Sequence, residues 1–240
     1  MWSSTEMIAG NSVSGGVMEA VVIVTGSTLT AGGNSLLSAA AGDASGRTMV
    51  PDEAGGPDVS EISERYQRLG DAFAAEIAAV GDDQWSSPTP CAEWTARDLV
   101  GHVVGSQGMF LGFVGQEVGD VPTVDDDPLG AWNGTRAAVQ ANLDDPARAT
   151  VEFDGFFGRQ TFESAVDRFL CVDLVVHGWD LARAAGLDEQ MDPDDVERVR
   201  RAAEAFGEAA RSPQVFGPAI EAPEGANDQE RLLAFLGRQP

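Results

Sequence analysis

The chain contains only two histidines, and both lie in apolar stretches with helical periodicity. His102 lies in DLVGHVVGS, and His177 lies in FLCVDLVVHGWDLA, where Asp173 precedes it by four residues. Side chains four residues apart share one face of a helix, so Asp173 and His177 point toward the same region. Two imidazoles and a carboxylate that converge in a helical protein form a divalent-metal site with open coordination positions. His102, Asp173 and His177 are therefore candidate metal ligands.

Asp173 is the one charged residue in the middle of an otherwise apolar helix, so we expect it to be buried. A buried, ionised carboxylate costs on the order of several kcal/mol unless it is paired or binds a cation. Its partner is either an arginine on a neighbouring helix, such as Arg97 or Arg136, or a metal ion shared with His177. A hydrogen-bonded core residue is the alternative role for each histidine.

Asp180 lies almost one helical turn beyond His177. It could accept a hydrogen bond from the ligand imidazole and so orient the ring. It could equally be a helix-end carboxylate that pairs with Arg183. The sequence leaves both roles open.

Four more residues near these positions have roles that the sequence indicates. Cys91, in the loop before the His102 helix, is expected to be a small buried thiol, although a helix N-terminus could lower its pKa. Cys171 lies on the wrong side of its helix to join the ligands. Trp94 and Trp179 are expected to belong to the core or to the wall of the site.

Helical periodicity dominates from residue 60 onward. Thr95 followed by Asp98 resembles a capping box with Asp in place of the usual Glu or Gln, which predicts that His102 lies about two turns into its helix. The segment ATVEFDGFFGRQTF alternates β-branched and aromatic residues and predicts a short strand or hairpin. The predicted helices span residues 60–80 with Ser60 as N-cap, 95 to about 114, 128–143, 163–186 ending at Gly186, 193–210, and 228–236 with Asn227 as N-cap.

The composition excludes several classes of partner. Acidic residues outnumber basic residues 39 to 15 and the net charge is −24, so nucleic acid and anionic membrane surfaces are not expected partners. The longest apolar run near the start, VMEAVVIV, is far shorter than the ~20 residues of a membrane span. Two cysteines without CxxC spacing indicate a reducing cytoplasm.

The chain divides into two parts by composition. Residues 1–57 are rich in Gly, Ser, Ala and Thr without amphipathic periodicity, so they are expected to form a disordered or weakly ordered extension. Residues 58–240 carry the helical patterns and are expected to form one all-α metal-binding domain.

The segments PTPCAEWTARDLVGHVVG, VDLVVHGWDLARAAG and FGPAIEAPEGANDQERLLAFLG resemble the metal-binding members of the DinB and mycothiol-dependent maleylpyruvate isomerase superfamily. The resemblance covers about residues 60–240. It implies a four-helix bundle in down-up-up-down order, here with a small hairpin and a C-terminal helix. It also implies that His102, Asp173 and His177 hold the metal. Asp173 stands where the isomerase pattern has Glu, so the ligand side chain is one methylene group shorter.

The resemblance implies that the open coordination position receives a low-molecular-weight thiol such as mycothiol, with Zn²⁺ as the metal. The partners would then be a small-molecule thiol and a small electrophile, and the reaction would be S-transfer or isomerisation. The tail after the last bundle helix is too short for the additional domain of the isomerase, which favours S-transfer.

Two alternative functions would use the same residues. A non-enzymatic metal-binding bundle could act as a sensor or interaction module, and a homodimer that covers apolar parts of the bundle would fit it. An iron oxygenase also uses two histidines and one carboxylate. Those triads usually lie on β-barrels, whereas this chain is helical.

Overall fold

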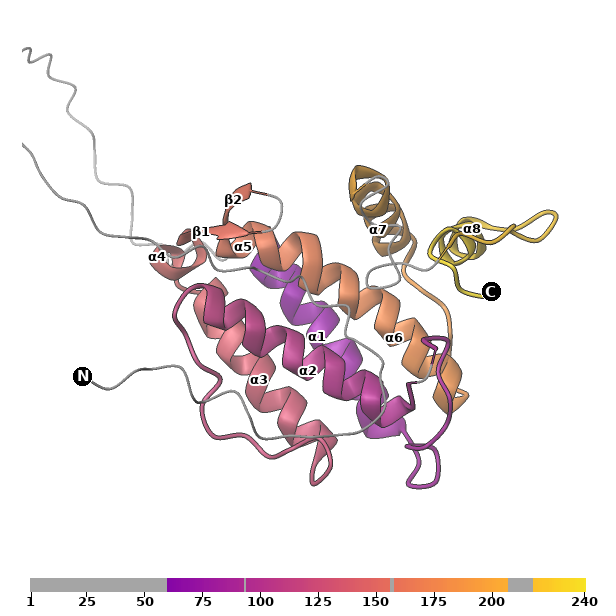
Figure 1. Cartoon of the computed structure of the whole chain (residues 1–240), viewed down its shortest axis with the longest axis horizontal. Coiled ribbons are helices and arrows are strands. Elements are labelled where there is room, and N and C mark those ends of the chain that lie inside the picture. Colours follow the sequence, from indigo (N-terminus) through magenta and orange to yellow (C-terminus); the bar gives the residue numbers. More distant parts are fainter. Residues whose placement is uncertain (1–59, 93, 156–157, 207–217) are drawn as a thin grey trace, which may run out of the picture.

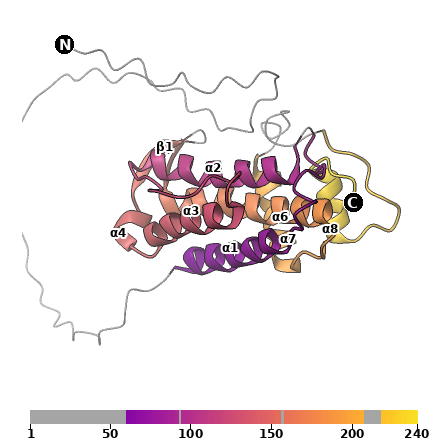
Figure 2. The ribbon, with the colours of Figure 1, turned by 90° about the horizontal axis from the view of Figure 1, so that it is seen from below.

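The computed structural model describes residues 60–92, 94–155, 158–206 and 218–240. The predicted extension, residues 1–57, lies outside the described residues. Four long helices form a ring, in which α1 and α2 each pack against both α3 and α6 (Figures 1 and 2). Their bounds are Glu61–Ala79 for α1, Ala96–Phe113 for α2, Pro128–Leu143 for α3 and Cys171–Ala185 for α6. The ring brings together α2 and α6, the two helices that carry the candidate ligands.

The predicted helix starts are confirmed at the capping residues. The Ser60 side chain accepts a hydrogen bond from the backbone N–H of Ser63 at the start of α1. Thr95 and Asp98 form a reciprocal capping box at the start of α2, so the first turn of α2 is fixed. Asn227 and Glu230 form the same box at the start of α8 (Asp228–Phe235).

The helix predicted over 163–186 consists of three continuous parts. It begins as α5 (Phe162–Ala165), passes through a π-helical stretch, η1 (Val166–Leu170), and continues as α6. It ends at Gly186, whose φ of 63° is the left-handed conformation that favours glycine at a helix end. The π-helical stretch was not predicted, because an extra residue in a helical turn leaves the apolar pattern nearly unchanged.

The remaining elements lie beside this ring and are α4 (Pro146–Ala149), β1 (Glu152–Gly155), β2 (Gly158–Thr161), α7 (Pro193–Phe206) and α8. The predicted hairpin is present, with β1 antiparallel to β2 and Glu152 opposite Thr161. α7 packs against α6 and α8 (Figure 1). The helix predicted over 193–210 is described as far as Phe206, and its last four predicted residues lie outside the described part.

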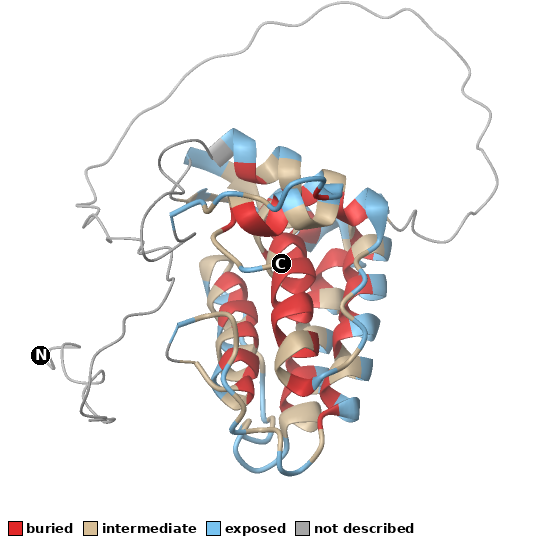
Figure 3. Cartoon of the chain, turned by 90° about the vertical axis from the view of Figure 1, so that its right-hand side faces the viewer, coloured by how far each residue is buried: buried red, intermediate tan, exposed pale blue. Residues whose placement is uncertain are grey.

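Buried residues gather on the inward faces of the ring helices (Figure 3). Two large buried polar side chains inside the ring are hydrogen-bonded. The Tyr66 hydroxyl donates to Oε1 of Gln107 at 2.8 Å, and Nε1 of Trp132 donates to the carbonyl of Gly70 at 3.1 Å. The described part of the chain is therefore mostly helical with one small hairpin, and the predicted all-α class is confirmed. Among the described helices, none has both the length and the apolar character needed to cross a membrane.

Candidate metal centre

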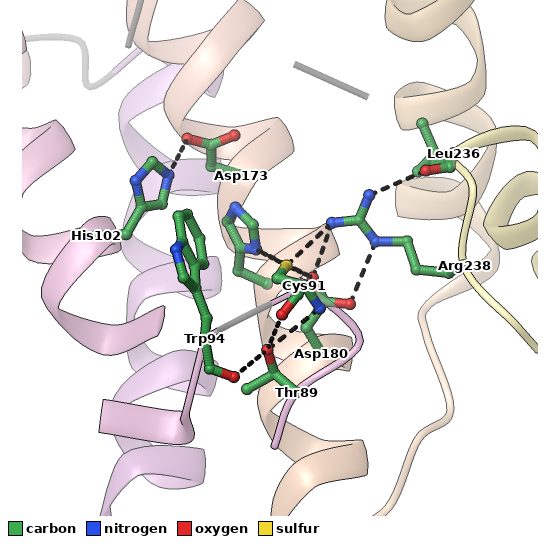
Figure 4. Close-up of polar contacts among 9 residues, drawn as sticks. Thr89, Cys91, Trp94, His102, Asp173, Asp180, Leu236 and Arg238 are labelled. Atoms are coloured by element: carbon green, nitrogen blue, oxygen red, sulfur yellow. Dashed lines mark hydrogen bonds and ion pairs between the residues drawn. The ribbon is translucent and has the colours of Figure 1, made fainter. Parts of the chain in front are cut away.

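The structure brings His102 of α2 together with Asp173 and His177 of α6. One donor atom of each residue lies within 4.8 Å of the donor atoms of the other two. Nε2 of His102 lies 4.0 Å from Oδ2 of Asp173. The two imidazole rings have centroids 5.2 Å apart and are inclined at 79°. Figure 4 shows the His102 ring facing the Asp173 carboxylate across the gap between the two helices.

This donor set fits a divalent metal ion. Two imidazole nitrogens and one carboxylate oxygen are the protein ligands of many catalytic zinc sites. Zinc–ligand distances of about 2.0–2.2 Å place tetrahedral ligand atoms roughly 3.4 Å apart. The 4.0 Å between His102 and Asp173 is a little longer, so small side-chain movements would allow both residues to share one ion. Three protein ligands leave a coordination position open.

The prediction that Asp173 is buried was wrong. The Asp173 side chain is 36% exposed to solvent. Helix α6 turns this charged side chain toward water while the apolar residues around it stay buried. Neither predicted arginine partner pairs with it. Arg97 donates to the carbonyl of Val124 at 2.6 Å, and Arg136 pairs with Asp71 at 2.6 Å. The Asp173 carboxylate is therefore the part of this group that is most open to solvent.

His177 is oriented by Asp180. Its Nδ1 lies 3.0 Å from Oδ2 of Asp180, whose side chain is completely buried. Since Nδ1 is engaged in this way, the opposite ring nitrogen, Nε2, is the one available to a metal. The alternative partner of Asp180, Arg183, forms an ion pair with Glu189 at 3.0 Å instead.

A second group of donor atoms shares the His177 imidazole. Atoms of Cys91, His177 and Asp180 also lie within 4.8 Å of one another. Here Nη2 of Arg238 lies 2.9 Å from Oδ2 of Asp180 and 3.6 Å from Sγ of Cys91. The guanidinium already neutralises the carboxylate and would repel a second cation. Of the two groups, that of His102, Asp173 and His177 is therefore the better candidate for binding a metal ion.

Sequence reasoning missed Arg238 because it lies 58 residues beyond Asp180, and no local pattern pairs residues that far apart. Cys91 was expected to be buried, but it is half-buried. Its Sγ lies 3.3 Å from Oδ2 of Asp180 and 3.9 Å from Nδ1 of His177. Cys171 is buried, and burial raises the pKa of its thiol to about 12.

The two histidines differ in protonation. Burial and the neighbouring charge of His177 lower the pKa of His102 to about 4, although Asp173 opposes this shift. Burial alone would lower the pKa of His177, but its hydrogen bonds with Asp180 and Cys91 and the charge of Asp173 raise it well above the usual value. His102 is thus neutral near pH 7 with a free lone pair, as metal coordination requires.

Trp94 forms one wall of the site. Its ring centroid lies 4.7 Å from that of His102 (Figure 4). The distance to the ring centroid of His177 is 6.1 Å. The backbone N–H and the hydroxyl of Thr89 both donate to the carbonyl of Trp94, at 2.9 and 3.0 Å. Trp179 is buried, and the guanidinium of Arg183 lies 4.6 Å from the centre of its ring.

The chain is similar to known proteins over most of its described part. The family model for the mycothiol maleylpyruvate isomerase N-terminal domain matches residues 66–154, a range that includes His102 and ends before α6. Two proteins from two strains of Mycobacterium tuberculosis, both described as uncharacterized, are 32% identical to the chain over 175 residues. Each alignment covers 72% of this chain and 95% of the relative. The comparison with solved structures found no significant match.

Proposed function

Because this chain belongs to the mycothiol maleylpyruvate isomerase N-terminal domain family of the DinB-like superfamily, we propose that it binds one zinc ion and activates a low-molecular-weight thiol. His102, Asp173 and His177 hold the ion in this proposal. The observation that supports it is the convergence of two imidazoles and one carboxylate at a solvent-accessible edge. We also propose that the four helices form the down-up-up-down bundle that the superfamily implies, and that residues 58–240 form one metal-binding domain.

The chain's own residues prepare the site for this chemistry. His102 is neutral and ready to donate its lone pair, and Asp180 holds His177 with Nε2 toward the site. Trp94 packs against the His102 ring and lies near the His177 ring, so it supports one side of the site. The exposed edge at Asp173 lets a thiol reach the open position. When bound, zinc acidifies a coordinated thiol and so makes its sulfur nucleophilic at neutral pH without a separate base.

We propose that this activated thiol, mycothiol or a related cytoplasmic thiol, is transferred to a small electrophile or catalyses its isomerisation. S-transfer is the reaction that we favour. The thiol sulfur forms a bond to the electrophilic carbon, and either a halide leaves or a proton adds across the attacked double bond.

Thiol-dependent turnover tests this function. Zinc-loaded protein, mycothiol and a chlorinated nitrobenzene should give the thioether and chloride, and His102→Ala should abolish the reaction above the uncatalysed rate. Arg231→Ala, which removes an exposed ion pair with Asp228 on α8, is a matched surface control. Metal binding without turnover across mycothiol, bacillithiol and glutathione would contradict the enzyme proposal and favour a metal-binding sensor or interaction module.

A further inference from the structure

We propose that Arg238, near the C-terminal end of the chain, is a positioning residue of the metal centre. It contacts no candidate ligand directly but fixes Asp180, which in turn orients His177. This inference rests on the proposed metal site and adds a fourth part of the chain to it. The C-terminal tail, the loop with Cys91, α2 and α6 would then form one functional unit.

The contact between Arg238 and Asp180 is bidentate and buried. Nε of Arg238 lies 3.2 Å from Oδ1 of Asp180, and Nη2 lies 2.9 Å from Oδ2. The Asp180 side chain is completely buried, and that of Arg238 retains 10% of its exposure. A bidentate arginine fixes the plane of the carboxylate as well as its position. The orientation of Asp180 is therefore set by Arg238 and not by α6 alone.

The end of α8 aims Arg238 at this carboxylate. Gly237 has a φ of 80°, a left-handed conformation that reverses the chain directly after the helix. The backbone N–H groups of Gly237 and Arg238 donate to the carbonyls of Ala234 and Leu233. Nη1 of Arg238 also donates to the carbonyl of Leu236 at 3.1 Å (Figure 4). Both the backbone and the guanidinium of Arg238 are thus held in place.

Arg238 and His177 meet at the same carboxylate oxygen. Oδ2 of Asp180 accepts from Nη2 of Arg238 and lies 3.0 Å from Nδ1 of His177. Without the guanidinium, a fully buried carboxylate loses the bidentate partner that fixes its plane and can rotate away from His177. Loss of hydrogen bonds that orient a ligand histidine typically lowers metal affinity about 10–100-fold. The route from Arg238 through Asp180 to His177 therefore links the C-terminal tail to metal affinity.

The experiment compares zinc affinity in wild type, Arg238→Met and Arg183→Met. Arg183 is the matched control, because it anchors the same tail through the carbonyl of Gln239 but does not touch Asp180. Arg238→Met should weaken zinc binding about tenfold or more in a competition with a chromogenic chelator. It should also shift the visible absorption bands of the Co²⁺-substituted protein, which report ligand geometry. Arg183→Met should leave both readouts unchanged.

If Arg238→Met does not fold, the same two measurements on Arg238→Lys test the inference instead. Lysine keeps the charge but cannot form both hydrogen bonds, so a smaller loss of zinc affinity and shifted Co²⁺ bands are expected. A folded Arg238 variant with wild-type affinity and wild-type bands would overturn the inference, as would an equal loss in Arg183→Met. Zinc titration of the wild-type protein distinguishes failure of the proposed metal site from failure of the proposed role of Arg238. Absence of metal uptake by wild type overturns the metal site itself, whereas uptake with unaffected Arg238 variants overturns only the role of Arg238.

Discussion

The Nδ1 atom of His177 lies 3.0 Å from the Oδ2 atom of Asp180, inside the protein and away from solvent. A carboxylate in this position fixes both the ring orientation and the tautomer of a histidine. His177 can therefore present only Nε2 to an ion that it shares with His102 and Asp173.

Asp180→Asn should weaken zinc binding by about 10–100-fold while the chain remains folded. The amide keeps the size of the side chain but removes the charge that favours a proton on Nδ1 of His177. Chelator competition measures the change, and circular dichroism checks the fold. The control is Asp188→Asn, since Asp188 is exposed and caps only the local turn at Gln190. Equal affinities of wild type and Asp180→Asn would show that Asp180 does not orient a ligand.

Zinc affinity should rise with pH by about one logarithmic unit per pH unit between about pH 6 and 8. In the metal-free protein, His177 keeps its proton in this range because its pKa is raised, so zinc must displace that proton. His102 contributes no proton there, since its pKa is about 4. Chelator competition at three pH values provides the slope. A flat profile would mean that His177 is not the ligand that exchanges a proton for the metal.

The periodicity and capping residues of the sequence predicted much of the fold and the candidate ligands. The Thr95 and Asp98 box begins α2 as expected, and helical spacing predicted that Asp173 and His177 share a face. These features depend on neighbours within a few residues. The exposure of Asp173 and the contact of Arg238 with Asp180 depend on tertiary packing between distant segments. No local pattern encodes such contacts, so sequence reasoning missed them.

Glu76→Gln should remove a pH-dependent loss of stability. Oε2 of Glu76 is buried against α6 near Gly178 without a hydrogen-bond partner among the described residues. Burial raises the pKa of Glu76 from 4.5 to about 7. Because the folded-state pKa is raised, the stabilising contribution is fully present below about pH 4.5 and is lost as pH rises through about 7.

The size of this effect follows from the pKa shift. Wild type should lose up to about 3 kcal/mol of unfolding free energy from Glu76 between pH 4 and 8, and Glu76→Gln should lack this component. Urea unfolding of both proteins at the two pH values measures the difference, because contributions of other groups cancel in the comparison. An identical pH dependence in the two proteins would contradict burial of an unpaired carboxylate.

Thr95→Ala should cost about 1 kcal/mol of stability and also weaken zinc binding. It removes the capping box of α2 and loosens the adjacent Trp94, whose ring lies against His102. Ser60→Ala removes the N-cap of α1 and serves as the control, with a similar loss of stability and unchanged zinc affinity. Thermal unfolding and chelator competition provide the two values. Equal zinc affinity in both variants would argue that the Trp94 wall does not support the site.

Metal content tests the central proposal most directly. Protein purified without a histidine tag from zinc-supplemented cells should contain about one zinc ion per chain by plasma mass spectrometry. His177→Ala and His102→Ala should each contain less than about one tenth of that amount while remaining folded. Wild-type protein without stoichiometric metal, or folded variants that retain it, would contradict a metal site formed by His102, Asp173 and His177.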